Sequence, residues 1–153
     1  MCGIVGVASK NGIEYREWIS HARDLLTYRG PDDYGEWWSS DYQVGFGHRR
    51  LSIMDTSNAG HQPMSDQSGL LHIVFNGEIY NFVELRKELI QLGEIFKSDC
   101  DTEVLLCAYK VWGADCLAHL NGMFAFALHD ARNNTLFMAR DRIGEKPLFY
   151  HEP

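Results

Sequence analysis

The chain has 153 residues, of which 45% are hydrophobic and 23% charged, a balance typical of one globular domain. Its formal net charge of −7 argues against nucleic acid or an anionic membrane surface as the main partner. No apolar run approaches the roughly 20 residues of a membrane span, and the start MCGIVGVASKNG lacks the features of a signal peptide. The four cysteines form no C-x-x-C pair, so we expect a cytoplasmic protein with reduced thiols.

The first half of the chain is predicted to contain several strands and one helix. The apolar run GIVGVASK predicts a short, fully buried strand, and the apolar spacing between Glu14 and Tyr28 predicts a helix. The stretch YRGPDDYG ends that helix, because glycine, proline and paired aspartates favour turns. Residues 37–38, YQVGFGH and RRLSIMD predict successive strands, and SNAGHQPMSDQSG predicts a loop.

The second half alternates pairs of strands with pairs of helices. LLHIVFNGEIYN predicts a strand, FVELRKELIQLG a helix closed by Gly93, and SDCDTEVLLCAYKVWG a second helix ending at a glycine. NGMFAFALHD and TLFMARDR predict two strands joined by a hairpin, and PLFYHEP follows what looks like the entry to another strand. This order indicates antiparallel sheets covered by helices.

Cys2 has two interpretations. It is either an ordinary small residue at the start of a buried strand or, once Met1 is removed, a nucleophile that carries its own base. An α-amino group has a pKa of about 7.7–8.0 and a thiol one of about 8.5, so the amine can accept the thiol proton. Methionine removal is favoured by a small second residue, but position two alone favours the structural interpretation.

Asn76 and Gly77 also have two interpretations. Acyl chemistry at a cysteine needs an oxyanion hole, and the two residues offer a side-chain amide and an unobstructed backbone N–H. The same dipeptide is a leading signal for a hairpin turn. The residues that follow predict a helix rather than a strand, which weakens the hairpin interpretation without removing it.

Several charged residues suit an amino-acid substrate. Arg49 and Arg50 are adjacent on a predicted strand, so their side chains face opposite ways, and one can bind a carboxylate while the other is solvated. An edge-strand pair that is solvated on both sides is the alternative. Glu78 and Asp101 are candidates for binding an ammonium group, although Asp101 is equally suited to cap a helix. The histidines show no catalytic or metal-binding spacing, and no loop matches a phosphate-binding motif.

Eight stretches occur in the order seen in class II glutamine amidotransferase domains, which the chain therefore resembles. They are MCGIVGV, RGPDDYG, GHRRLSIMD, QPM, FNGEIYN, DTEVLL, LNGMFAFALHD and ARDRIGEKPLFY. The form RGPDD is most similar to the glutaminase domain of glutamine-hydrolysing asparagine synthetases. The resemblance implies an α+β fold, the four-layer αββα sandwich of N-terminal-nucleophile hydrolases with antiparallel sheets. It makes residues 1–153 one glutaminase domain, which we expect to be incomplete at its C-terminus and to lack its last strands.

The resemblance also implies a set of site residues. Cys2 would be the nucleophile after removal of Met1, with an oxyanion hole formed by Asn76 and Gly77. Arg50 rather than Arg49 would bind the α-carboxylate of glutamine. Glu78 and Asp101 would bind its α-amino group, with Asp99 a less favoured alternative to Asp101. The main chain lining the site would come from Leu51, Ser52, Ile53 and Met54.

The activity implied is hydrolysis of L-glutamine to glutamate and ammonia through a cysteine thioester. In a longer protein, the ammonia would pass to a C-terminal synthetase domain that makes asparagine from aspartate. We expect no cofactor and no metal in this domain, with ATP and Mg needed only by the synthetase domain, whose SGGxDS loop is absent from this sequence. A homodimer, another acceptor such as a sugar carboxylate, and a catalytically silent truncated domain that acts as a binding module remain open.

Overall fold

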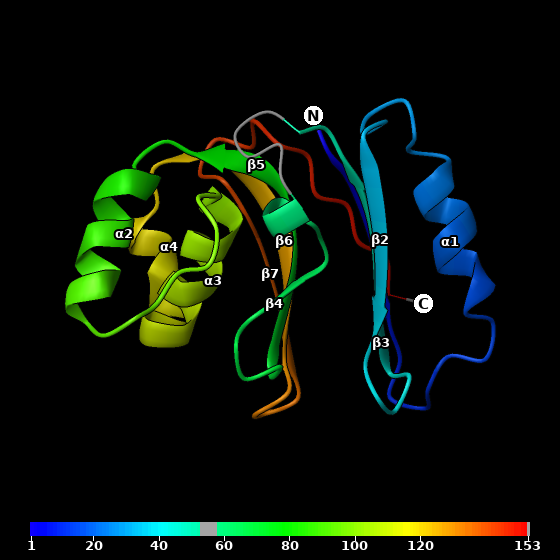
Figure 1. The fold of residues 1–153 in the computed structure, drawn as a ribbon. Helices are drawn as coiled ribbons and strands as arrows, with labels where there is room; N and C mark the ends of the chain where they lie inside the picture. The colour runs from blue at the N-terminus through cyan, green and yellow to red at the C-terminus, as the bar shows by residue number, and fades with distance from the viewer. Residues whose placement is uncertain (53–57, 153) are drawn as a thin grey trace.

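The chain forms a sandwich of two antiparallel sheets with helices on both outer faces (Figure 1). This computed structural model describes residues 1–52 and 58–152. The layers follow the order helix, sheet, sheet, helices, which confirms the expected α+β fold with its αββα arrangement. No helix within the described ranges is long and apolar enough to cross a bilayer.

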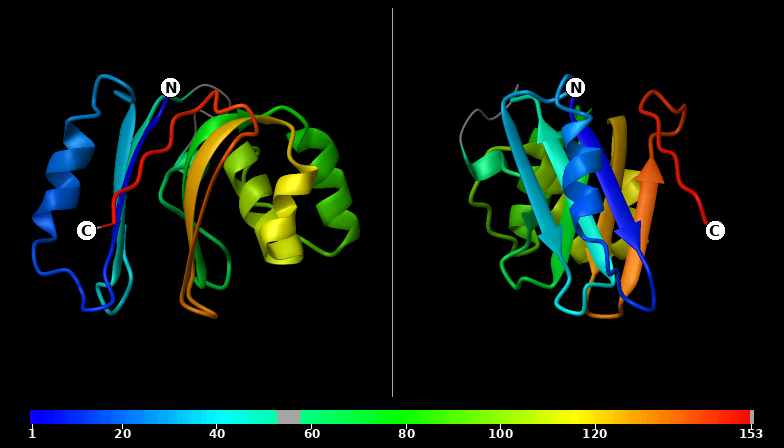
Figure 2. Two further views of the ribbon diagram at one scale, coloured as in Figure 1. Left: turned by 180° about the vertical axis from the view of Figure 1, so that it is seen from behind. Right: turned by 90° about the vertical axis from the view of Figure 1, so that its right-hand side faces the viewer.

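The first sheet has three strands in the order β1-β3-β2, and helix α1 covers its outer face (Figure 2). The elements are β1 (Gly3–Ala8), α1 (Glu17–Asp24), β2 (Asp33–Trp38) and β3 (Val44–Arg50). The stretches YQVGFGH and RRLSIMD were predicted as separate strands, but β3 takes residues from both. The prediction that the first strand is fully buried is also wrong. Only Gly3 of β1 is fully buried, because β1 lies at the edge of this sheet.

Helix α1 is shorter than the apolar spacing predicted. Residues 25–29 form turns, and the N–H groups of Leu26 and Thr27 bond to carbonyls only three residues back. Ile19 is fully buried against the sheet, whereas Trp18 and Leu25 are largely exposed. The predicted apolar face is therefore correct at its centre and wrong at its edges.

The second sheet has four strands in the order β4-β5-β6-β7. Its elements and the segments beside it are η1 (Asn58–Gly60), β4 (Met64–Ser65), β5 (Leu71–Ile79), α2 (Phe82–Gln91), α3 (Asp101–Trp112), η2 (Gly113–Asp115), α4 (Cys116–His119), β6 (Gly122–Asp130) and β7 (Thr135–Arg140). The predicted hairpin joins β6 to β7, and Gly93 and Gly113 follow α2 and α3 as expected. The predicted strand entry at PLFYHEP is not found, since residues 145–152 contain no strand.

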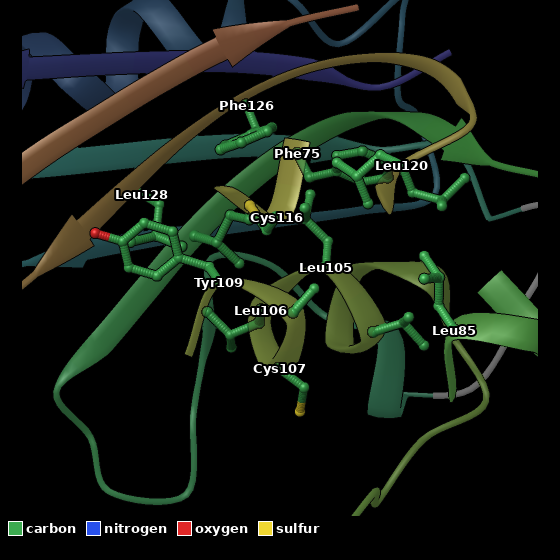
Figure 3. Packing of buried hydrophobic residues seen from close by; sticks show 14 of the residues in the cluster. Phe75, Leu85, Leu105, Leu106, Cys107, Tyr109, Cys116, Leu120, Phe126 and Leu128 are labelled. Carbon is green, nitrogen blue, oxygen red and sulfur yellow. The ribbon is translucent and has the colours of Figure 1, made fainter. Parts of the chain in front are cut away.

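The main core lies between the second sheet and its helices (Figure 3). Successive side chains of a strand point to opposite faces, so Ile73, Phe75 and Ile79 of β5 enter this core. Val74 points the other way and packs with Phe46 in a smaller cluster between the two sheets. By the same alternation, Asn76 and Glu78 face the first sheet. The register of β5 therefore determines which side chains can form a site between the sheets.

His48 lies fully buried between the sheets, where its ring Nε2–H donates to the Phe75 carbonyl oxygen at 3.1 Å. Burial lowers the pKa of His48 from its usual 6.5 to about 4. The neutral ring is thus favoured in the folded state, and acidification must oppose folding. The contribution is intact above pH 6.5, declines as the pH falls, and is lost by about pH 4.

We expect this single group to reduce the free energy of unfolding by about 2 kcal/mol between pH 7.5 and pH 5. Urea unfolding at the two pH values measures the loss in the natural protein, in His48→Gln and in the control His21→Gln, which changes an exposed ring. The His48 variant should show a loss about 2 kcal/mol smaller than the other two proteins. Equal losses in all three would contradict the prediction.

Candidate active site

The starts of β1 and α3, the end of β3 and the C-terminal half of β5 surround one cavity of about 80 Å³. Seven residues of the predicted set line it: Cys2, Arg50, Leu51, Asn76, Gly77, Glu78 and Asp101. The other lining residues are Met1, Gly60, Gln62, Phe75, Cys100, Thr102, Met123 and Lys146. The fold thus brings together residues that are up to 145 positions apart in the sequence.

Cys2 is half-buried at the head of β1. Its thiol donates to the Leu51 carbonyl oxygen at 3.9 Å and accepts from the Leu51 N–H at 3.5 Å, while Arg29 Nε–H donates to the Cys2 carbonyl oxygen at 3.2 Å. Gly3, the next residue, is paired with Arg49 of β3. Burial raises the pKa of the Cys2 thiol, so the thiol needs a base before it can act as a nucleophile.

Arg50 is the last residue of β3 and is only 7% exposed. Its guanidinium packs against Gly60, where any Cβ atom would collide with it. Arg49 points to the opposite face, and its guanidinium binds Asp24 Oδ1 at 2.6 Å. Of the two adjacent arginines, Arg50 is therefore the one that faces the cavity.

The edge of β5 provides a backbone donor at Gly77. Alternate amides of a strand point to the same edge, so the N–H groups of Phe75, Gly77 and Ile79 all face the same way. The Phe75 N–H donates to Gln62 Oε1 at 2.7 Å, and the Ile79 N–H donates to Asp101 Oδ2 at 2.9 Å. The Gly77 N–H lies between these two occupied amides and faces the cavity.

Asn76 places a side-chain amide in the same cavity. The residue is only 5% exposed, and its side chain has no hydrogen-bond partner in the described part of the chain. The polar atoms of this amide are not among the buried, unpartnered side-chain atoms of the described residues, so the amide is accessible from the cavity. It is therefore available to a ligand.

Glu78 and Asp101 supply two carboxylates to the cavity wall. Asp101 is 6% exposed. Burial raises the pKa of its carboxyl group, and the nearby charge of Glu78 adds to this effect. Backbone N–H donors lower the same pKa, but the net change is upward. The alternative prediction that Asp101 caps α3 is wrong by one residue. Cys100 occupies the N-cap position, and Asp101 is the first residue of the helix. Asp99 lies outside the cavity, with its exposed carboxylate paired with Arg86.

The predicted main-chain lining is only partly in place. Leu51 lines the cavity and contacts the Cys2 thiol. Ser52 does not line it, and its N–H donates to Asp32 Oδ2 at 2.8 Å. The predictions for Ile53 and Met54 lie outside the described residues.

Sequence reasoning missed Gln62 and Lys146 as parts of this site. Gln62 is buried, and besides binding the Phe75 amide it donates through Nε2 to Thr102 Oγ1 at 3.2 Å. Gln62 thereby connects β5 with the start of α3. Gln62 lies in QPM and Lys146 in ARDRIGEKPLFY, two of the stretches on which the family resemblance rests. Their place in these stretches was the one sequence feature that could have indicated a role in the site. Residues 1–52 and 58–152 contain no cluster of three His, Cys, Asp or Glu side chains suited to a metal.

Two stacked antiparallel sheets with helices on both outer faces form the αββα sandwich of the N-terminal-nucleophile hydrolase class of folds. The fold is similar to that of glutamine phosphoribosylpyrophosphate amidotransferase from Bacillus subtilis, with a TM-score of 0.73 over 90% of this chain and 37% of that one. The two sequences are 22% identical, so this comparison concerns the fold alone.

Within that class, the chain belongs to the glutamine amidotransferase domain family, whose model matches residues 1–153. It is 45% identical over 154 residues to asparagine synthetase [glutamine-hydrolyzing] 3 of Bacillus subtilis, over 98% of this chain and 25% of that protein. It is 37% identical to a putative asparagine synthetase of Methanocaldococcus jannaschii, over 99% of this chain and 32% of that protein. The chain therefore spans about a quarter to a third of the length of these relatives.

Proposed function

We propose that this domain hydrolyses L-glutamine to glutamate and ammonia through a thioester at Cys2, after removal of Met1. The observation that carries the proposal is the arrangement around the cavity. The Cys2 thiol, the Asn76 side-chain amide and the Gly77 backbone N–H meet there, beside a buried arginine and two carboxylates. These are the groups that an amide hydrolase for an amino-acid substrate needs.

The charges of the cavity match those of glutamine. Arg50 can bind the α-carboxylate with two parallel hydrogen bonds, since its guanidinium is a planar fork. Glu78 and Asp101 can bind the α-ammonium group, whose positive charge also relieves the repulsion between the two carboxylates. Held at this end, the substrate directs its side-chain amide toward Cys2, Asn76 and Gly77.

The reaction needs two acyl transfers. The α-amino group of Cys2 takes the thiol proton, and the thiolate attacks the amide carbon of glutamine. The oxyanion accepts hydrogen bonds from the Asn76 side chain and the Gly77 N–H. The amine then gives its proton to the leaving nitrogen, so that the C–N bond breaks, ammonia departs and a thioester remains. Water, losing a proton to the same amine, attacks the thioester, and glutamate leaves as the thiol is restored.

The fate of the ammonia is a property of the whole protein. Relatives named asparagine synthetases support a synthetase domain as the partner that consumes the ammonia, in the same chain or in a second one. There the acceptor would be aspartate, and ATP and Mg would be required. This part of the proposal rests on the names of longer relatives, whereas the hydrolysis of glutamine also rests on the cavity.

The test is the mass and activity of the natural full-length protein. We expect its mature N-terminus to begin at Cys2, and we expect it to release glutamate from L-glutamine but not from D-glutamine. Intact-mass analysis and an enzyme-coupled glutamate assay measure the two properties. A protein that retains Met1 or leaves L-glutamine intact would count against the proposal and favour a silent binding module.

Arg50→Lys tests the assignment of the carboxylate-binding group. We expect KM for glutamine to rise roughly 10- to 100-fold with little change in kcat, because lysine keeps the charge but loses the two-pronged hydrogen bond. The matched control is Arg49→Lys, since Arg49 faces away from the cavity and pairs with Asp24. Steady-state kinetics should show no change in KM for the control. A similar rise in both variants would contradict the assignment to Arg50.

A further inference from the structure

Lys146 is a buried cation that the mechanism above does not use. It lies in the segment after β7, is 5% exposed and lines the same cavity. Its Nζ donates to the Met1 sulfur at 3.2 Å. Within the described residues, no carboxylate lies within ion-pair distance of this ammonium. Its one polar partner therefore belongs to a residue whose removal the proposed function requires.

Asp141 fixes the turn that carries Lys146. The Asp141 carboxylate is 4% exposed and accepts the N–H groups of Glu145 at 2.8 Å, Lys146 at 2.9 Å and Phe124 at 3.2 Å. Although burial opposes ionisation, these N–H donors lower the pKa of Asp141 to about 2. Phe124 is also the residue of β6 that pairs with Gly77. The turn is thus attached directly behind the proposed oxyanion hole.

The charged groups around Cys2 lie on two sides of it. Arg50 of β3 and Asp101 of α3 act on the thiol, the first favouring and the second opposing its ionisation, and Glu78 of β5 lies beside Asp101. Arg29, after α1, is bonded to the Cys2 carbonyl oxygen. Lys146 instead contacts Met1, the residue joined to the Cys2 nitrogen. It therefore lies on the side of Cys2 where the free amine forms.

We propose that, in the mature protein, the Lys146 ammonium faces the α-amino group of Cys2 and favours the neutral form of that amine. The proposal rests on the proposed function, in which this amine is the base. Removing Met1 takes away the sulfur that Lys146 contacts and creates a free amine next to the space that this side chain filled. Lys146 is thus a positioning residue that acts on the base rather than on glutamine.

The physical reason is repulsion between like charges. A free α-amino group with an ordinary pKa of about 7.7–8.0 is mostly protonated at pH 7, and a protonated amine cannot act as a base. A nearby cation that is itself buried disfavours a second positive charge on the amine and shifts its titration by about one pH unit. The neutral, active fraction of the amine then dominates at neutral pH.

The test is the pH dependence of kcat/KM for glutamine hydrolysis by the natural full-length protein. In Lys146→Met, which keeps the length of the side chain but removes the charge, the acidic limb should move up by about one pH unit. Lys146→Arg, which restores the charge, should return it toward the natural position. The matched control Lys87→Met, at an exposed position of α2, should leave the profile unchanged. KM for glutamine at high pH should be the same in all four proteins.

A second readout does not need catalysis. NMR titration of protein labelled with 15N at cysteine follows the Cys2 amine directly, in samples that intact mass shows to begin at Cys2. The titration should move up by about one pH unit in Lys146→Met. An unchanged titration overturns the proposal, as does a rise in KM without any change in the pH profile, which would place Lys146 on the substrate. If the natural protein hydrolyses no glutamine, the proposed function fails, and the titration still decides whether Lys146 acts on the amine.

Discussion

Replacing Cys2 by alanine is expected to lower the rate of glutamine hydrolysis by roughly 10⁴-fold or more. The variant keeps the arginine, the carboxylates and both oxyanion donors of the cavity, but it has no atom that can form the thioester. Alanine is small and fits the start of β1, where Cys2 is already half-buried. We therefore expect the urea unfolding midpoint to stay close to that of the natural protein.

Glutamate release under saturating glutamine measures the effect, with Cys107→Ala as the control. Cys107 is a buried thiol of α3 that does not line the cavity, so its loss should leave the rate nearly unchanged. The assignment of the nucleophile would be falsified if Cys2→Ala hydrolysed glutamine as fast as the natural protein. Alkylation by iodoacetamide adds a separate check, because Cys2 should react faster once Met1 is removed and an adjacent base is free.

Asn76→Ala is expected to lower kcat by about 10²- to 10³-fold while KM for glutamine stays within a few-fold. The side-chain amide has no hydrogen bond to the described part of the chain, so its removal costs little stability. The oxyanion forms only during the reaction, and for that reason the loss should appear in kcat rather than in binding. Gly77→Ala is a poorer test, since its Cβ would collide with the Met123 carbonyl oxygen and with Phe124.

Asn81→Ala is the matched control for Asn76→Ala. The Asn81 side chain donates to the His119 carbonyl oxygen at 2.9 Å and accepts the Asn121 N–H at 2.9 Å, so its role is structural. We expect this variant to lose about 1–2 kcal/mol in free energy of unfolding but to keep kcat within twofold. An Asn76 variant with an unchanged maximal rate would rule out Asn76 as an oxyanion donor.

Much of the fold could be predicted because its apolar pattern is local. The runs that form β5, β6 and α3 are long and apolar, and their order indicates sheets covered by helices. The edges of the sandwich were harder to predict. Whether β1 is buried and how far α1 extends depend on which strand lies next to β1 and where the chain turns at residues 25–29. Those facts belong to the assembled fold, and no short stretch of sequence contains them.

Some residues of the candidate site could likewise be predicted from the sequence, and others could not. The side chains with obvious chemistry, such as Cys2 and Arg50, were predicted from residue type and from resemblance to a family. Gln62 and Asp141 were not, because each acts by binding backbone amides of distant strands. Which amides need a side-chain partner depends on where neighbouring strands stop. The amides left without a strand partner are therefore known only once the strands are paired, and the residue types alone do not reveal them.

The Gly77 N–H, which we propose as an oxyanion donor, is available to a ligand because strand β4 is short. β4 pairs only with His72 and Ile73, and the residue before it is Pro63, which has no N–H to offer a neighbour. An evolutionary change that lengthened β4 by a few residues would cover the Gly77 N–H and, under the proposed mechanism, inactivate the domain while every side chain of the candidate site remained unchanged. A homologue with all these residues intact can therefore be inactive, and aligning side chains alone would not reveal it. The length of the strand beside β5 is the additional feature to compare when such domains are sorted into enzymes and inactive descendants.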